Sequence, residues 1–250
     1  MRDGDPGLEV YLLRRVSSMA FAAGMTVFPG GSVDQRDAHV PDAAWAGPSA
    51  EDWATPLGAD TDLARALVCA AVRETFEESG VLLAGHSSGD VVDDTRGDDW
   101  EADRLALIDR DLSFAEMLAR RGLVVRTDLL RPWGHWVTPD VESRRFDTRF
   151  FVAALPSGQL TRDVGGEADR VHWMRPVDAI AENERGEMVL LPPTHATLTD
   201  LMAYDAVADV LGTDRNVTRI APKVLVEDID GVAGGPTLRF TLPGDPDYPD

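Results

Sequence analysis

The segment VCAAVRETFEESGVLLA, residues 68–84, most constrains what this chain can fold into. Its apolar residues recur at helical spacing, and the pattern begins upstream near Thr61, with Asp60 or Thr61 as the N-terminal cap. Gly80 stands where a left-handed residue commonly ends a helix. The segment therefore predicts an amphipathic helix from about residue 61 to 79, followed by a short buried strand.

Three glutamates gather on one side of this helix. Glu74, Glu77 and Glu78 lie three and four residues apart, so they share a face opposite the apolar stripe. Like charges repel, and carboxylates in the last turn oppose the helix dipole. A solvated helix face is one interpretation. The other is a metal site, because Mg²⁺ prefers oxygen ligands and commonly joins one or two carboxylates to substrate phosphates.

Charge and composition limit the function classes. A net charge of −20 argues against nucleic acid as a partner, because binding to a phosphate backbone depends on basic surface. A small anionic substrate remains compatible if a divalent cation and local arginines reverse the field. The single cysteine, Cys69, predicts a buried, inert thiol and a reducing compartment. No apolar run is long enough to span a membrane and no signal peptide is evident, so we expect a cytoplasmic protein without membrane contact.

Helix and strand patterns alternate along the chain, which favours one α/β or α+β domain over residues 1–250. Helices are expected near 100–109, from Ser113 to Gly122, after Pro193 and after the strand at 171–174. Strands of a mixed sheet are expected in WGHWVTP and RRFDTRFFVAAL, with a terminal hairpin in the tail. Residues 35–60 show no clear periodicity and predict a long surface insertion.

The N-terminus carries a turn without an obvious preceding strand. RDGDPG has the composition of a hairpin turn and leads into the strand LEVYLLRR. Two explanations follow: the natural protein begins upstream, or this strand has lost its partner.

The residues around the glutamates resemble the Nudix hydrolase signature, Arg-Glu-apolar-x-Glu-Glu-x-Gly-apolar. RETFEESGV matches it except at Thr75, and FPGG upstream supplies the opening glycine Gly31 and its neighbour Gly30, both candidate substrate-binding residues. The resemblance implies that Arg73 orients a glutamate, that Glu77 and Glu78 bind Mg²⁺ or Mn²⁺, and that Glu74 binds metal or acts as the base.

Two departures from the family pattern are visible. Gly31 and Arg73 are 42 residues apart, an insertion of 28 relative to the pattern. The first glutamate of the signature is expected eight residues before Arg73, where Arg65 stands. We expect its loss to affect the geometry of the loop more than the chemistry.

The order of weaker matches resembles one branch of the superfamily, the animal peroxisomal coenzyme A diphosphatases. These matches are FPGG with a long insertion, the glutamate segment, WVTP, RRFDTRFFVAAL, LPPTHATLTDL and LPGD. The Arg-x-His expected before Gly24 in the better-known coenzyme A enzymes is replaced by FAA, and the C-terminal DYPD is no peroxisomal address.

Other residues are candidates for the same site. Glu167 resembles a further metal-binding acid that such enzymes recruit from a loop, although a solvated carboxylate is an equal alternative. Arg145 and Arg149 are expected to share a strand face and could bind diphosphate, although salt bridges are an alternative use.

The resemblance implies a Nudix-type α/β/α sandwich with a mixed sheet, an insertion at about 35–60 and a C-terminal extension at about 190–250. The expected reaction is metal-dependent hydrolysis of a nucleoside diphosphate derivative, with coenzyme A or an acyl-coenzyme A as the candidate substrate and Mg²⁺ or Mn²⁺ as cofactor. ADP-ribose or dinucleotide hydrolysis remains open, as does a non-catalytic nucleotide-binding module. A homodimer is possible by the same resemblance.

Overall fold

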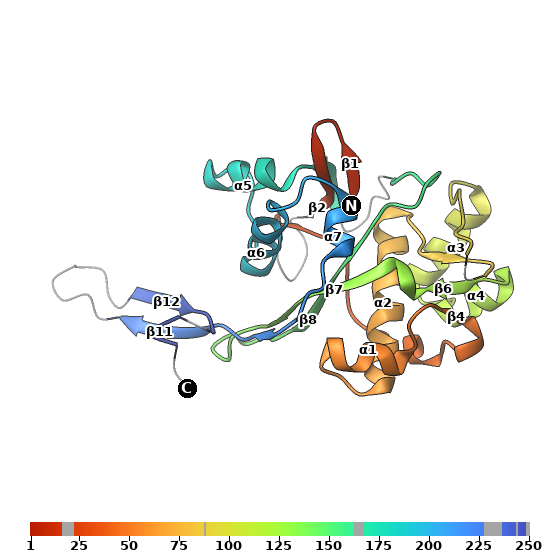
Figure 1. The fold of residues 1–250 in the computed structure, drawn as a ribbon, viewed down its shortest axis with the longest axis horizontal. Coiled ribbons are helices and arrows are strands. Elements are labelled where there is room, and N and C mark those ends of the chain that lie inside the picture. Colours follow the sequence, from red (N-terminus) through yellow and green to blue (C-terminus); the bar gives the residue numbers. More distant parts are fainter. Residues whose placement is uncertain (17–22, 88, 163–167, 228–236, 244, 249–250) are drawn as a thin grey trace.

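The computed structural model describes residues 1–16, 23–87, 89–162, 168–227, 237–243 and 245–248 (Figure 1). Its longest helix, α2 (Thr61–Ser79), carries the glutamate segment. The Asp60 carboxylate accepts a hydrogen bond from the Leu63 N–H, and Gly80 ends the helix in the left-handed region with φ of 74°. Both predicted ends are confirmed. Cys69 is buried on the inner face of α2, and burial raises its pKa, as expected of an inert thiol.

The strands form mixed sheets, as predicted. β2 (Gly7–Arg15) pairs antiparallel with β1 (Arg2–Gly4), β3 (Thr26–Val27) and β9 (Ala168–Met174). β7 (Leu130–Val137) pairs antiparallel with β8 (Asp147–Ala153) and parallel with β10 (Arg219–Ile220). β6 (Val124–Arg126) pairs parallel with β4 (Trp45–Ala46) and antiparallel with β5 (Ala84–Gly85). The expected terminal hairpin is β11 (Lys223–Glu227) with β12 (Thr237–Thr241).

Two hydrophobic cores lie on either side of the long β7–β8 pair (Figure 1). The first surrounds α2 and is completed by α1 (Ala50–Leu57), α3 (Asp98–Ile108) and α4 (Phe114–Arg121). The second packs β2 and Trp133 against α5 (Pro176–Glu184), α6 (Pro192–Leu201) and α7 (Val207–Gly212). Helix α4 begins after Ser113, as expected, and Ser113 forms a capping box with Glu116.

Residues 35–60 differ from the expected surface insertion. They form two short 3₁₀ helices (Gln35–His39 and Asp42–Ala44), β4 and α1. Their side chains Val40, Trp53 and Leu57 are buried in the first core. The segment therefore contributes to the core and does not lie over it as an irregular loop.

The N-terminal turn has a strand before it. Residues Arg2–Gly4 pair with β2 around the Asp5-Pro6 turn, so β2 has not lost its partner. The second explanation offered for this turn is therefore wrong.

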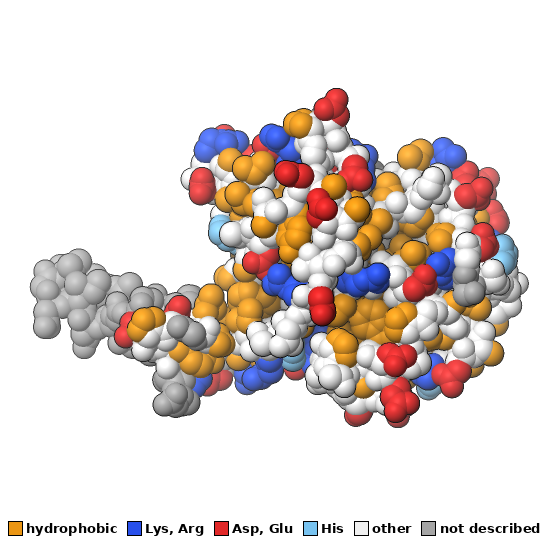
Figure 2. All heavy atoms as spheres, in the orientation of Figure 1, with side chains coloured by type: hydrophobic (Ala, Val, Ile, Leu, Met, Phe, Trp, Pro, Cys, Tyr) orange, Lys and Arg blue, Asp and Glu red, His pale blue; other side chains and the backbone are white. Residues whose placement is uncertain are grey.

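None of the described helices is long and apolar enough to cross a membrane. Acidic side chains are spread in small groups over the face shown in Figure 2, with lysines and arginines between them. On this face the acidic surplus does not form a single patch.

Candidate functional site

Arg73 is the centre of the charged cluster on α2. Its Nε and Nη2 donate to the two carboxylate oxygens of Asp37, both at 2.9 Å. Its Nη1 donates to Glu74 Oε1 at 2.9 Å and Glu77 Oε1 at 3.0 Å, and Nη2 also donates to the Ser32 carbonyl at 2.9 Å. All five guanidinium N–H donors are thus used. Burial alone would lower the Arg73 pKa, but the bonds to Asp37 and the surrounding carboxylates raise it.

The two glutamates bound by Arg73 hold their protons more tightly than usual. Burial raises the pKa of Glu74 to about 7, the charge of Glu77 adds to this shift, and Arg73 opposes it. Burial also raises the pKa of Glu77, against Arg73 and the more distant Arg104. A carboxyl with a pKa near neutrality is suited to exchange a proton with a substrate or water at working pH.

The raised pKa of Glu74 predicts a pH-dependent cost in stability. The folded state binds this proton with a pKa of about 7, against 4.5 for the unfolded chain, so folding loses stability as pH rises through that window. Glu74→Gln keeps an oxygen for Arg73 but removes the charge. We expect Glu74→Gln to be about 2–3 kcal/mol more stable than wild type at pH 8 and equal to it below pH 4.5.

Denaturant unfolding of both proteins at pH 4 and pH 8, with chelator present, measures this difference. Titrations common to both proteins cancel in the comparison. A constant difference across the pH range would show that Glu74 titrates alike in the folded and unfolded states, as a solvated carboxyl does.

The glycines of FPGG lie against the carboxylates of α2. The Gly30 N–H donates to Glu78 Oε2 at 2.6 Å. A Cβ at Gly31 would lie 2.4 Å from Glu74 Oε2, so a larger residue would displace that carboxylate. The structure therefore places Gly30 and Gly31 beside Glu78 and Glu74, while their substrate-binding role stays a prediction.

Asp37 is a site residue that the sequence analysis missed. Counting back from Arg73 gives Arg65, which instead donates to the Val40 carbonyl at 2.9 Å and pairs with Asp42. Counting forward from Gly31, the first acid of the signature falls six residues on, at Asp37. Asp37 is 1% exposed and forms a bidentate ion pair with Arg73. The acid expected to be lost is therefore present as aspartate, and the insertion lies between it and Arg73.

Two other candidates, both arginines, are not brought to this cluster. Arg149 lies on β8, where it pairs with Asp147 and donates to the Leu57 carbonyl at 3.1 Å, beside the beginning of α2. At a rise of about 1.5 Å per residue, this end of α2 is roughly 20 Å from the glutamates. Arg145 precedes β8, so it does not share a strand face with Arg149 as expected, and it donates to the Thr138 carbonyl. Glu167 lies outside the described residues.

The cluster carries more negative than positive charge. Asp37, Glu74 and Glu77 surround the guanidinium of Arg73, and Glu78 adds a fourth carboxylate one turn from Glu74. Among the described residues, no three acidic, histidine or cysteine side chains are arranged to hold a metal ion as they stand. Three of these carboxylates are directed at Arg73. The chemistry of the donor set fits a divalent cation, because oxygen ligands in excess of the local positive charge are what Mg²⁺ and Mn²⁺ prefer.

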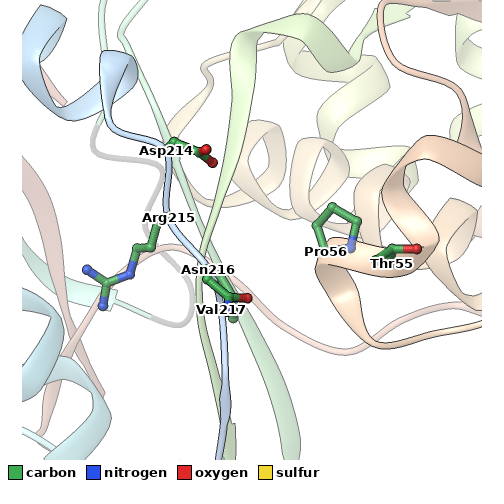
Figure 3. Close-up of a pocket in the computed structure, with 6 residues that line it drawn as sticks. All are labelled: Thr55, Pro56, Asp214, Arg215, Asn216 and Val217. Carbon is green, nitrogen blue, oxygen red and sulfur yellow. The ribbon is translucent and has the colours of Figure 1, made fainter.

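Two hollows lie away from the glutamates. One, of about 310 Å³, lies between α1 and the segment 214–217, and is lined by Thr55, Pro56, Asp214, Arg215, Asn216 and Val217 (Figure 3). The other, of about 240 Å³, lies between β7 and α6 and includes Trp133 and Trp136. Neither contains a residue of the charged cluster. The position of the buried ionisable groups therefore defines the candidate site better than the shape of the surface does.

The fold is shared with a known class of enzyme. The structure of a NUDIX hydrolase from Alicyclobacillus acidocaldarius superposes with a TM-score of 0.71 and 31% sequence identity, covering 86% of this chain and 93% of that one. With the glutamate helix and FPGG placed together, this likeness defines the chain as a Nudix-type pyrophosphohydrolase. The chain matches the model of the NUDT19 Nudix domain over residues 48–201, and it belongs to that family.

This chain matches several named relatives, and the match covers a different share of each relative's length. The chain is 26% identical over 279 residues to acyl-coenzyme A diphosphatase NUDT19 of Xenopus laevis, covering 97% of this chain and 72% of that protein. It is 28% identical over 192 residues to putative nudix hydrolase 7 of Caenorhabditis elegans, covering 77% of this chain and 55% of that protein. It is 26% identical over 238 residues to the human acyl-coenzyme A diphosphatase NUDT19, covering 82% of this chain and 63% of that protein. The chain thus spans less than two thirds of the worm and human relatives.

Proposed function

We propose that this chain is a metal-dependent diphosphatase that cleaves the diphosphate of coenzyme A or an acyl-coenzyme A. The observation that carries the proposal is the buried cluster of Arg73, Glu74 and Glu77 on α2, with Glu78 beside it against Gly30. Relatives named acyl-coenzyme A diphosphatase support this choice of substrate. A binding module would have no use for so many converging carboxylates, whose burial costs stability.

A divalent cation, Mg²⁺ or Mn²⁺, is the cofactor we propose. Glu77 and Glu78 are its expected ligands, with Glu74 as a third ligand or as the base. Such an ion offsets diphosphate charge and lowers the pKa of a bound water. Glu167 remains a proposed additional ligand.

The protein groups around the glutamates have distinct roles in this proposal. Arg73 orients Glu74 and Glu77, and Asp37 holds Arg73 in place by its bidentate pair. Glu74, with a pKa of about 7, can take a proton from water at neutral pH. The backbone at Gly30 and Gly31 keeps the carboxylates in position and leaves space for them. Arg145 and Arg149, first considered for diphosphate binding, have structural partners in the described residues.

Gly31→Ala tests the close contact between the glycine loop and α2. The added methyl would lie 2.4 Å from Glu74 Oε2, so the carboxylate has to move. We expect hydrolysis to slow about 10- to 100-fold, because small displacements of a reacting group have effects of this size. Gly89→Ala is the control, because a Cβ there meets nothing within 4 Å. Equal rates for the two variants would show that Glu74 does not have to occupy its observed position.

Product analysis by mass spectrometry tests the proposed reaction. The purified protein, with Mg²⁺ or Mn²⁺ and with chelator, is given coenzyme A, acyl-coenzyme A, ADP-ribose, NADH and diadenosine polyphosphates. Release of 3′,5′-ADP and a phosphopantetheine product, lost with chelator, is the expected result. Cleavage of ADP-ribose or a dinucleotide instead would retain the site and change the substrate. No metal-dependent cleavage of any of them would overturn the proposal in favour of a non-catalytic nucleotide-binding module.

The remaining expectations concern organisation and location. We propose one Nudix domain over residues 1–250, with residues 190–250 as its C-terminal extension. A cytoplasmic location, the absence of nucleic-acid binding and a possible homodimer remain predictions from the sequence.

A further inference from the structure

The last turn of α2 has no basic residue of its own, although it carries Glu77 and Glu78. The carbonyl end of a helix is negative, and its final carbonyl groups lack partners within the helix. The Phe76 carbonyl accepts from the Gly80 N–H, and the Gly80 carbonyl accepts from Thr95 Oγ1 at 2.6 Å. Neither bond offsets the charge of the glutamates. Arg73 on the same helix pairs with the side chains of Glu74 and Glu77, but its printed bonds reach none of the final carbonyl groups. A positive group at the carbonyl end itself has to come from another part of the chain.

Arg104 on α3 supplies such a group. Its side chain is 3% exposed, and Nη1 donates to the Glu77 carbonyl at 2.7 Å. Its Nε and Nη2 donate to the two carboxylate oxygens of Glu101 at 2.9 and 2.6 Å. Because the Glu101 carboxylate holds two of the three guanidinium nitrogens, the orientation of the planar group is fixed. The third nitrogen, Nη1, then points toward the end of α2.

Arg162 lies against the same helix end. Its backbone N–H donates to the Ser79 carbonyl at 3.0 Å, and its Nη2 donates to the Thr95 carbonyl at 2.9 Å. Its Nη1 lies 3.2 Å from Glu101 Oε2, so Glu101 joins Arg162 to Arg104. A Cβ at Gly80 would lie 2.8 Å from Arg162 Nε, which gives Gly80 a packing reason besides its positive φ.

We propose that Arg104 and Arg162, joined by Glu101, form a cationic clamp that holds the last turn of α2 so that Glu77 and Glu78 are in position to bind metal. Arg104 is the principal positioning residue, because it binds the backbone of Glu77 itself. The inference rests on the proposed function for the role of the glutamates, but the clamp is a property of the helix end alone.

The test compares Arg104→Met with Arg126→Met. Arg126 is also buried, is held by both carboxylate oxygens of Asp128 and donates to the Asp90 carbonyl, but it does not bond to α2. Amide hydrogen exchange of the peptide 74–80 reports the clamp. Titration with Mn²⁺ without substrate, followed by electron paramagnetic resonance, reports ligand position.

Arg104→Met should speed exchange in peptide 74–80 and weaken Mn²⁺ binding about 10- to 100-fold, the usual effect of losing a group that orients metal ligands. It should lower kcat more than it raises KM. Arg126→Met should change neither exchange nor Mn²⁺ affinity. Arg104→Lys should recover part of the affinity. If Arg104→Met does not fold, Glu101→Gln gives the same comparison with smaller changes in the same direction.

Equal exchange in the Met variants would overturn the clamp. Unchanged or tighter Mn²⁺ binding in Arg104→Met would overturn the positioning role. Tighter binding would show that the positive charge of Arg104 only repels the cation. Failure of the wild type to bind Mn²⁺ would overturn that role together with the proposed function, while the exchange result would still decide the clamp.

Discussion

Arg73→Met is expected to destabilise the folded protein by about 3–5 kcal/mol at pH 8, the usual cost of removing one partner from a buried ion pair. Asp37, Glu74 and Glu77 all accept hydrogen bonds from this guanidinium, and the side chains are between 1% and 12% exposed. Methionine fills a similar volume but donates no hydrogen bond. The carboxylates then remain buried without their shared cation, which lowers the free energy of unfolding.

The size of this effect should depend on pH. Without Arg73 the raised pKa values of Glu74 and Glu77 rise further, so these two carboxyls bind protons as the pH falls and their buried charge disappears. The destabilisation should therefore be smaller at pH 5 than at pH 8. Urea unfolding at both pH values measures it.

Arg96→Met is the matched control. Arg96 makes a similar two-bond contact with Asp94 at 2.8 and 2.9 Å, but both side chains are about half exposed. Exposed pairs contribute little because water screens them, so we expect no measurable change. If Arg73→Met were equally mild, water would reach the cluster and the raised pKa of Glu74 would need another cause.

Local signals predicted the motif helix well. The caps Asp60 and Gly80 act within one turn of the chain, and the apolar spacing of α2 was visible over its whole length. The resemblance pointed to Gly31 as the opening glycine of the signature, and the structure adds its contact with α2, because a Cβ there would displace the Glu74 carboxylate from its observed position.

The insertion was harder to interpret. Ser49 and Asp52 form a capping box that could have predicted α1, but Pro56 lies inside the helix and the surrounding Ala, Pro and Gly residues concealed its period. Asp37 is not found by counting back from Arg73, because that count stops at Arg65 and the insertion separates Asp37 from Arg73. The pairing of Asp37 with Arg73 joins residues 36 apart in sequence, and spacing alone does not fix such a contact.

The contacts of the arginines were also not predictable from their spacing in the sequence. Alternation along a strand placed Arg145 and Arg149 on one face, but β8 begins at Asp147, so Arg145 lies in the turn before it. Arg104 was not singled out, because its importance comes from the packing of α3 against the end of α2 and not from its neighbours in sequence.

Glu78→Gln is expected to reduce metal-dependent hydrolysis about 10³-fold, which corresponds to about 4 kcal/mol of lost transition-state stabilisation. Glutamine has nearly the same shape, and its side-chain oxygen can still accept the hydrogen bond from the Gly30 N–H. The fold and the glycine loop should therefore be retained. The measured loss then reports the removal of the negative charge with which Glu78 would bind a divalent cation.

Steady-state rates with saturating Mg²⁺ and Mn²⁺, together with thermal unfolding, separate this loss from misfolding. Glu51→Gln is the control, because it makes the same chemical change on an exposed position of the neighbouring helix α1. We expect it to leave both rate and Tm unchanged. A wild-type rate for Glu78→Gln would remove Glu78 from the metal site and leave Glu74 and Glu77, which share Arg73, as the remaining carboxylates of α2 able to act there.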